Sequence, residues 1–190
     1  MATVIGISGS LRRGSYNTAL LRAAVSLAPS DLTIEVASIR EIPLYDGDVE
    51  REQGVPPAVS QLKERLAASD GLLLVTPEYN NSLPGVLKNA IDWLTRPARD
   101  IPRVFGDKPV ALMGATTGRG GTRLAQAAWL PVFRTLGMRP WFGRQLYVAE
   151  AAQVFDADGA LRDPKVRDLL AAFMSDFAAF VARRAPADSR

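Results

Sequence analysis

Residues 3–17 have the sequence TVIGISGSLRRGSYN, which combines a predicted strand, a polar loop and the start of a predicted helix. Its first five residues are apolar and β-prone and run into serine and glycine, which is typical of a buried parallel strand. A polar loop follows, with four hydroxyl side chains, two glycines and two arginines in ten residues. Apolar residues at helical spacing then begin beyond Asn17. Such a loop can present backbone amides and hydroxyl donors to an anion at a helix N-terminus.

The alternation of strand and helix continues along the chain. Strands are predicted over residues 3–7, 33–38, 71–76, 110–114 and 138–148, the last interrupted around Gly143. Helices are predicted over residues 17–27, 60–68, 84–94, 122–136 and 165–184. This alternation implies an α/β fold with a parallel sheet that helices cover on both faces. Residues 45–57 are expected to be the longest irregular segment.

Composition limits the chemistry that the chain can perform. With 190 residues and no internal repeat or long linker, residues 1–190 are expected to form a single domain. The chain has no cysteine and no histidine, which excludes zinc–thiolate sites, histidine-containing triads and cysteine nucleophiles. No metal site is expected. The chemistry must come from carboxylates, hydroxyls, cations, backbone amides or a borrowed cofactor.

Charge and hydropathy predict a location and exclude two kinds of partner. The formal net charge is +3, but the arginines are scattered and form no basic stripe, so no nucleic-acid partner is predicted. We expect no signal peptide, and no apolar run is long enough to cross a bilayer. The protein is therefore expected to be cytoplasmic, without a membrane partner.

Three loops follow predicted strands, at residues 8–17, 77–84 and 115–121. In doubly wound sheets, ligands bind outside the carboxyl ends of the strands, so these loops are expected to converge on one site. The spacing of Gly9 and Gly14 resembles the start of a Walker A loop, but no lysine follows, and the dinucleotide fingerprint is absent. The many hydroxyls favour a terminal monophosphate. The alternative is an ordinary polar strand–helix turn.

The second and third loops suit a flat ligand. Pro77 and Pro84 restrict the backbone on either side of Glu78-Tyr79-Asn80, which makes this loop a plausible wall for a planar heterocycle. The alternative role for Tyr79 is packing, and packing is the favoured role for Trp93. The third loop has four glycines in residues 114–122, which permit close approach of backbone to a ligand.

Three of these motifs resemble one family of enzymes. They are GSLRRGSYN at residues 9–17, PEYN at residues 77–80 and PGVLKNAIDW at residues 84–93. They are similar to the NADPH-dependent FMN reductase family, and within it to bacterial chromate/quinone reductases and azoreductase-like proteins. The resemblance implies a flavodoxin-like three-layer sandwich: a five-stranded parallel sheet of order 2-1-3-4-5 with helices on both faces.

The resemblance also implies which residues bind FMN. Those that hold its phosphate are Ser10, Arg12, Ser15, Tyr16 and Asn17. Those that lie against the isoalloxazine and ribityl chain are Pro77, Glu78, Tyr79 and Asn80. Those near the other edge of the ring are Thr116, Thr117 and Gly118. No residue is nominated as a catalytic acid or base, because the flavin carries the chemistry; Glu78 is expected to structure its loop.

The function implied is that of an FMN-dependent NAD(P)H oxidoreductase. It passes hydride from the nicotinamide to the flavin and then to a quinone, chromate, azo compound or similar acceptor. A homodimer or homotetramer is expected, with residues 45–51 and the helix from Pro84 as candidate contact surfaces. The alternative is a flavodoxin-type electron carrier without its own NAD(P)H oxidation, which the basic pI of about 9.5 disfavours. A receiver-like module would need clustered acids after the first strand, and residues 8–10 contain none.

Overall fold

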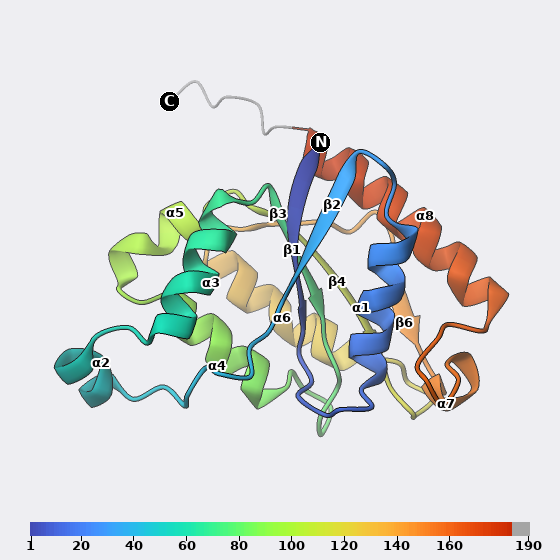
Figure 1. Ribbon diagram of the computed structural model, residues 1–190, viewed down its shortest axis with the longest axis horizontal. Helices are drawn as coiled ribbons and strands as arrows, with labels where there is room; N and C mark the ends of the chain where they lie inside the picture. Colours follow the sequence, from blue (N-terminus) through green and yellow to red (C-terminus); the bar gives the residue numbers. More distant parts are fainter. Residues whose placement is uncertain (184–190) are drawn as a thin grey trace.

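The computed structural model describes residues 1–183 and shows three layers, with a parallel sheet between two layers of helices (Figure 1). The strands are β1 (Ala2–Ser8), β2 (Leu32–Ala37), β3 (Gly71–Val75), β4 (Pro109–Ala115), β5 (Arg139–Pro140) and β6 (Leu146–Val148). The helices are α1 (Tyr16–Leu27), α2 (Gly47–Gln53), α3 (Pro57–Ala68), α4 (Gly85–Leu94), α5 (Ile101–Phe105), α6 (Arg123–Thr135), α7 (Ala151–Val154) and α8 (Pro164–Ala182), with a 3-10 turn at Ala98–Asp100. The order β2-β1-β3-β4-β5 confirms the predicted flavodoxin-like sheet, and β6 adds a sixth strand beside β4.

Two apolar cores lie on opposite faces of the sheet. On one face, Val4, Leu73 and Met113 pack with α1 and α8. On the other, Ile5 and Leu72 pack with α3, α4, α5 and α6. Successive side chains of a strand point to opposite faces, so the neighbours Val4 and Ile5 belong to different cores. Because both of their faces are covered, the central strands β3 and β4 are continuous apolar runs, as the sequence indicated, whereas β2 carries Thr33 and Glu35.

The structure corrects several predicted elements. The strand predicted over residues 138–148 is two short strands, because β4 pairs first with β5 and then with β6, and residues 141–145 leave the sheet between them. The segment predicted to be irregular contains α2, which has no buried residue and therefore no apolar periodicity to reveal it. Helices α5 and α7 are too short for a periodic pattern. The predicted last helix included Arg184, which lies outside the described residues.

None of the helices in residues 1–183 is long and apolar enough to span a bilayer. The longest, α8, packs one side against the sheet and has Leu170, Phe173, Met174 and Phe177 buried in the core. Asp163 caps its start, because its side chain accepts a hydrogen bond from the N–H of Val166 at 2.9 Å. Its apolar residues therefore serve the core of the fold.

Residues 43–53, which we call the α2 arm, stand away from the body of the protein (Figure 1). Polar contacts with α4 and with the residues that directly follow it hold the arm. The amide of Asn89 donates to the carbonyl of Pro43 at 2.8 Å and accepts from the N–H of Tyr45 at 2.8 Å. Glu50 accepts from the Tyr45 hydroxyl at 2.9 Å and from Arg96 at 2.8 Å. The hydrogen bond from Arg96 lowers the pKa of the Glu50 carboxyl below its ordinary value.

Close backbone packing at the carboxyl end of the sheet requires glycine at two positions. A Cβ on Gly114 would overlap the carbonyl oxygen of Thr76 and the hydroxyl of Thr122. The absence of a side chain at Gly114 therefore lets the ends of β3 and β4 pack closely against the start of α6. A Cβ on Gly9 would lie 2.8 Å from Cδ2 of Leu87 and 3.0 Å from Cδ of Pro77. These contacts bring the loops that follow β1, β3 and β4 close together.

We expect Gly114→Ala to destabilise the fold and Gly85→Ala to leave it intact. The added methyl at position 114 meets backbone that cannot move aside, and overpacking of this kind costs about 1–3 kcal/mol. At the start of α4, a Cβ on Gly85 meets nothing within 4 Å, and alanine favours the helix. Urea denaturation of both variants and the wild type measures the difference. Equal stability of the two variants would contradict the close packing at Gly114.

Candidate active site

The three loops that follow β1, β3 and β4 meet at one end of the sheet and enclose a cavity of about 450 Å³. This end is the lower edge of the molecule in Figure 1. Ten of the twelve predicted residues line the cavity: Ser10, Arg12, Ser15, Tyr16, Asn17, Pro77, Glu78, Tyr79, Thr116 and Thr117. Ala115 completes the lining and was not predicted, because the last residue of an apolar strand carries no chemical signal.

The start of α1 forms an end of the cavity that is suited to an anion. Ser15 is the N-cap, and its hydroxyl accepts the N–H of Thr18 at 3.3 Å. The N–H of Ala19 makes the first bond to the Ser15 carbonyl at 2.9 Å, so the N–H groups of Tyr16 and Asn17 have no partner inside the helix. Unsatisfied N–H groups and the positive end of the helix dipole favour a negatively charged group here.

An arginine adds positive charge at the same end. The guanidinium of Arg12 lies over the ring of Tyr16, 5.5 Å from its centroid, and Tyr16 stacks on Phe155 at 5.9 Å. Stacking holds the guanidinium by its face and leaves its N–H edge able to donate to an anion. A phosphate at this end would therefore receive charge-assisted hydrogen bonds.

Asn17 joins the first loop to the end of β4. Its side chain is 4% exposed, and its amide makes two hydrogen bonds with one backbone unit. Nδ2 donates to the carbonyl of Ala115, and Oδ1 accepts the N–H of Ala115, both at 2.9 Å. The side-chain amide is therefore engaged with β4. The backbone N–H of Asn17 and the second hydrogen of its Nδ2 are the donors that remain for the predicted phosphate contact.

Glu78 joins the second loop to the start of α6. One oxygen of its carboxylate accepts the N–H groups of Leu124 at 2.9 Å and Ala125 at 3.0 Å. Thr122, the N-cap of α6, makes no side-chain capping bond of its own. Glu78 therefore caps this helix from another part of the chain, where its negative charge also complements the helix dipole. This is the loop-structuring role expected of Glu78.

A tight turn forms the tip of the second loop. Tyr79 and Ser82 exchange two backbone hydrogen bonds, of 3.1 and 3.0 Å. Asn80 and Asn81 between them have φ of +50° and +60°, a conformation that asparagine tolerates better than most residues. Asn80 therefore shapes the turn and does not line the cavity. Tyr79 is 48% exposed and borders the cavity, so packing is not its role.

Trp93 has the packing role favoured from the sequence. Its side chain is fully buried in the core on the α4 side of the sheet. The indole Nε1 donates to the carbonyl of Pro43 at 2.9 Å, and the ring makes an edge contact with Tyr45. Trp93 therefore supports the base of the α2 arm and does not reach the cavity.

The third loop is held by the turn between β6 and α7. The N–H of Thr116 donates to the carbonyl of Val148 at 2.9 Å, and the N–H of Ala151 donates to the carbonyl of Thr116 at 3.0 Å. The carbonyl of Gly118 accepts the N–H of Glu150 at 3.0 Å. Thr116 and Thr117 line the cavity, and the predicted Gly118 does not.

The donor set of the cavity fits a phosphorylated planar heterocycle. Hydroxyls, helix N–H groups and a guanidinium gather at the α1 end. Pro77, Tyr79, Ala115 and the two threonines offer uncharged surface elsewhere, with both apolar groups and hydroxyls, beside the carboxylate of Glu78. A volume of about 450 Å³ lies in the range of sites for small ligands and cofactors, roughly 300–1,000 Å³. These features suit the phosphate and the ring of FMN.

Comparison with known proteins agrees with this geometry. The family model for NADPH-dependent FMN reductases matches residues 2–153, which include all three loops. An NAD(P)H-dependent FMN reductase of Pseudomonas aeruginosa is 47% identical over 167 residues, 88% of each chain. A 2-hydroxy-1,4-benzoquinone reductase of a Burkholderia species is 39% identical over 178 residues, 94% of this chain and 95% of the relative.

A solved structure has the same fold at nearly full length. It is a flavoenzyme NAD(P)H:(acceptor) oxidoreductase from Paracoccus denitrificans, with a TM-score of 0.85 and 34% identity. The match covers 96% of this chain and 98% of the other. The geometry of the cavity agrees with these similarities, which show that the chain belongs to the NADPH-dependent FMN reductase family.

Proposed function

We propose that this protein binds FMN in the cavity between its three loops and uses NAD(P)H to reduce quinones. The observation that carries the proposal is the convergence of Ser10, Arg12 and Ser15 with Pro77 and Tyr79 around one cavity. Family membership supports FMN and NAD(P)H. Relatives described as an FMN reductase and a benzoquinone reductase support a quinone as the acceptor.

The two ends of the cavity bind different parts of FMN. The hydroxyls of Ser10 and Ser15, the N–H groups of Tyr16 and Asn17 and the guanidinium of Arg12 hold the phosphate. The Pro77–Tyr79 wall and Thr116–Thr117 orient the ring. When bound, FMN supplies the hydride chemistry that the side chains of this chain lack. The N–H groups of Glu78 and Thr117, which make no hydrogen bond among the described residues, can stabilise negative charge that develops on the ring.

Chromate and azo compounds are further acceptors in this proposal. Tyr79 is half exposed at the rim, so one side of the cavity is open to a nicotinamide and, after it leaves, to a second substrate. An open rim imposes little selection by shape, so several oxidants can be accepted in turn at one site. The finer proposal is a cytoplasmic reductase, folded as one domain, with this range of acceptors.

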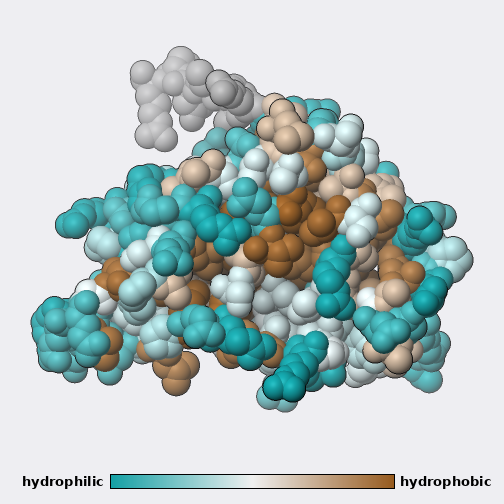
Figure 2. Space-filling model, viewed as in Figure 1, coloured by the Kyte–Doolittle hydropathy of each residue, from teal (hydrophilic) through white to brown (hydrophobic). Residues whose placement is uncertain are grey.

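We also propose that the protein forms a homodimer or homotetramer through the α2 arm and α4. Polar contacts hold the arm although α2 buries no residue of its own. Leu44 on the arm is 82% exposed and offers a partner an apolar contact. Figure 2 shows the arm as a mostly hydrophilic projection, and its four acids contrast with the net charge of +3 of the chain. A second copy offers the complementary charge.

Turnover separates a reductase from an electron carrier. The FMN-loaded protein is expected to oxidise NADH or NADPH when 1,4-benzoquinone is added, followed at the absorbance of the reduced nicotinamide. The same assay is repeated with chromate and with an azo dye as the acceptor. A yellow, FMN-containing protein that oxidises neither nicotinamide with any acceptor would favour the electron carrier. A protein that takes up no FMN would refute the proposed function itself.

Replacing Arg12 with alanine is expected to weaken FMN binding by about 1.5–3 kcal/mol, the range for hydrogen bonds to charged groups. This corresponds to roughly a 10- to 100-fold loss of affinity. Quenching of flavin fluorescence during titration of the apoprotein measures it. Riboflavin, which lacks the phosphate, should bind both proteins equally. Arg13→Ala is the matched control, because Arg13 is exposed and does not line the cavity. Unchanged FMN affinity in Arg12→Ala would show that Arg12 does not bind the phosphate.

A further inference from the structure

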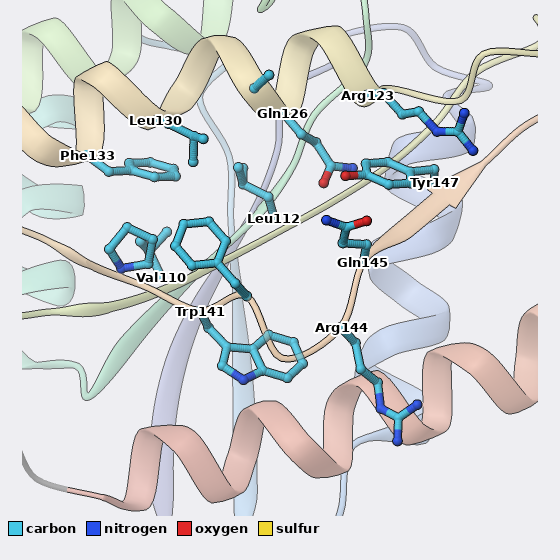
Figure 3. Close-up of a pocket in the computed structure, with 13 residues that line it drawn as sticks. Val110, Leu112, Arg123, Gln126, Leu130, Phe133, Trp141, Arg144, Gln145 and Tyr147 are labelled. Atoms are coloured by element: carbon cyan, nitrogen blue, oxygen red, sulfur yellow. The ribbon is translucent and has the colours of Figure 1, made fainter.

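A second cavity, of about 240 Å³, lies between α6 and the edge of the sheet. It shares no lining residue with the cofactor cavity. Figure 3 shows Leu130, Phe133 and Val110 around one end and Arg123 and Tyr147 at the other. The cavity therefore has an apolar end and a polar end.

The cavity arises from a break in strand pairing. Val110 pairs with Pro140, and Met113 pairs with Leu146, so β4 advances three residues while its partner segment advances six. The extra residues bulge away from the sheet under α6. Phe142 on this bulge is 65% exposed, although it lines the cavity. Leu130 on α6 is also exposed. Exposed apolar side chains gathered around one hollow are a sign of a binding site.

One cation at the polar end has no acidic partner among residues 1–183. Arg144 is paired with Asp176, whereas the ion pairs within residues 1–183 do not include Arg123. The guanidinium of Arg123 instead lies over the ring of Tyr147, 5.3 Å from its centroid. A stacked guanidinium presents a planar row of donors that matches the two oxygens of a carboxylate.

The shape and lining select a small aromatic ligand. Phe133, Trp141 and Phe142 line the cavity, and aromatic rings favour edge and offset contacts with another ring. Sites for drug-sized ligands enclose about 300–1,000 Å³, so about 240 Å³ suits one or two fused rings and is too small for a dinucleotide. We propose that this cavity is an accessory site for a small aromatic carboxylate, with its ring system at the apolar end and its carboxylate on Arg123.

Titration of the FMN-saturated protein with 1-naphthoate tests the proposal by calorimetry and by the fluorescence of tryptophan. One naphthoate is expected to bind per chain. Arg123→Gln should weaken naphthoate about three- to tenfold and leave the neutral analogue 1-naphthalenemethanol unchanged, because only the charge–charge contact is lost. Ala127→Phe, which adds a ring where α6 lines the cavity, should abolish binding of both compounds.

Arg134→Gln is the matched control and should bind naphthoate like the wild type, because Arg134 is an exposed arginine of α6 outside this cavity. Retention of FMN by each variant shows that it is folded, and the binding test requires no turnover. Failure of naphthoate to bind would overturn the proposal. So would equal binding to the wild type, Arg123→Gln and Ala127→Phe, which would put the ligand elsewhere. A change in oligomeric state caused by Ala127→Phe would also overturn it, by showing that a second copy fills the cavity.

Discussion

The pairing of the Asn17 amide with the backbone of Ala115 is the interaction on which the site depends most. It ties the first turn of α1, where we place the phosphate, to the end of β4, where the third loop begins. Each hydrogen bond contributes about 1 kcal/mol net, but a buried partner left unpaired costs about 1–3 kcal/mol. Removing the amide would leave both backbone groups of Ala115 without their partner. The geometry of two cofactor loops thus depends on one buried side chain.

The remaining links complete the same construction. The carboxylate of Glu78 connects the second loop to the start of α6, and α6 begins directly after the third loop. Gly9 and Gly114 allow the three loops to approach at distances that a Cβ would prevent. All these contacts are made between groups of the protein itself. Loops that hold one another in this way reduce the ordering that binding must impose.

The parts that repeat or bury apolar surface were predictable from the sequence. Continuous apolar runs indicated the buried strands, and the three loops could be assigned to one end of the sheet because parallel strands share their carboxyl edge. The α2 arm was missed, because a helix without a buried face has no periodic pattern. The division of the last strand was missed because the pairing of β4 decides it. Within the site, the motifs identified the right loops but not the role of each side chain. Only the fold shows that the side chain of Asn17 pairs with Ala115 and that Asn80 shapes a turn.

A crystal structure of the protein with FMN tests the account most directly. We predict that the phosphate lies at the start of α1, bonded to the N–H groups of Tyr16 and Asn17 and to Arg12. The ring is expected between the Pro77–Tyr79 wall and Thr116–Thr117, with the amide of Asn17 still paired with Ala115. A phosphate bound elsewhere, or an Asn17 amide that leaves Ala115 to bind it, would contradict a site whose loops are held by their own contacts.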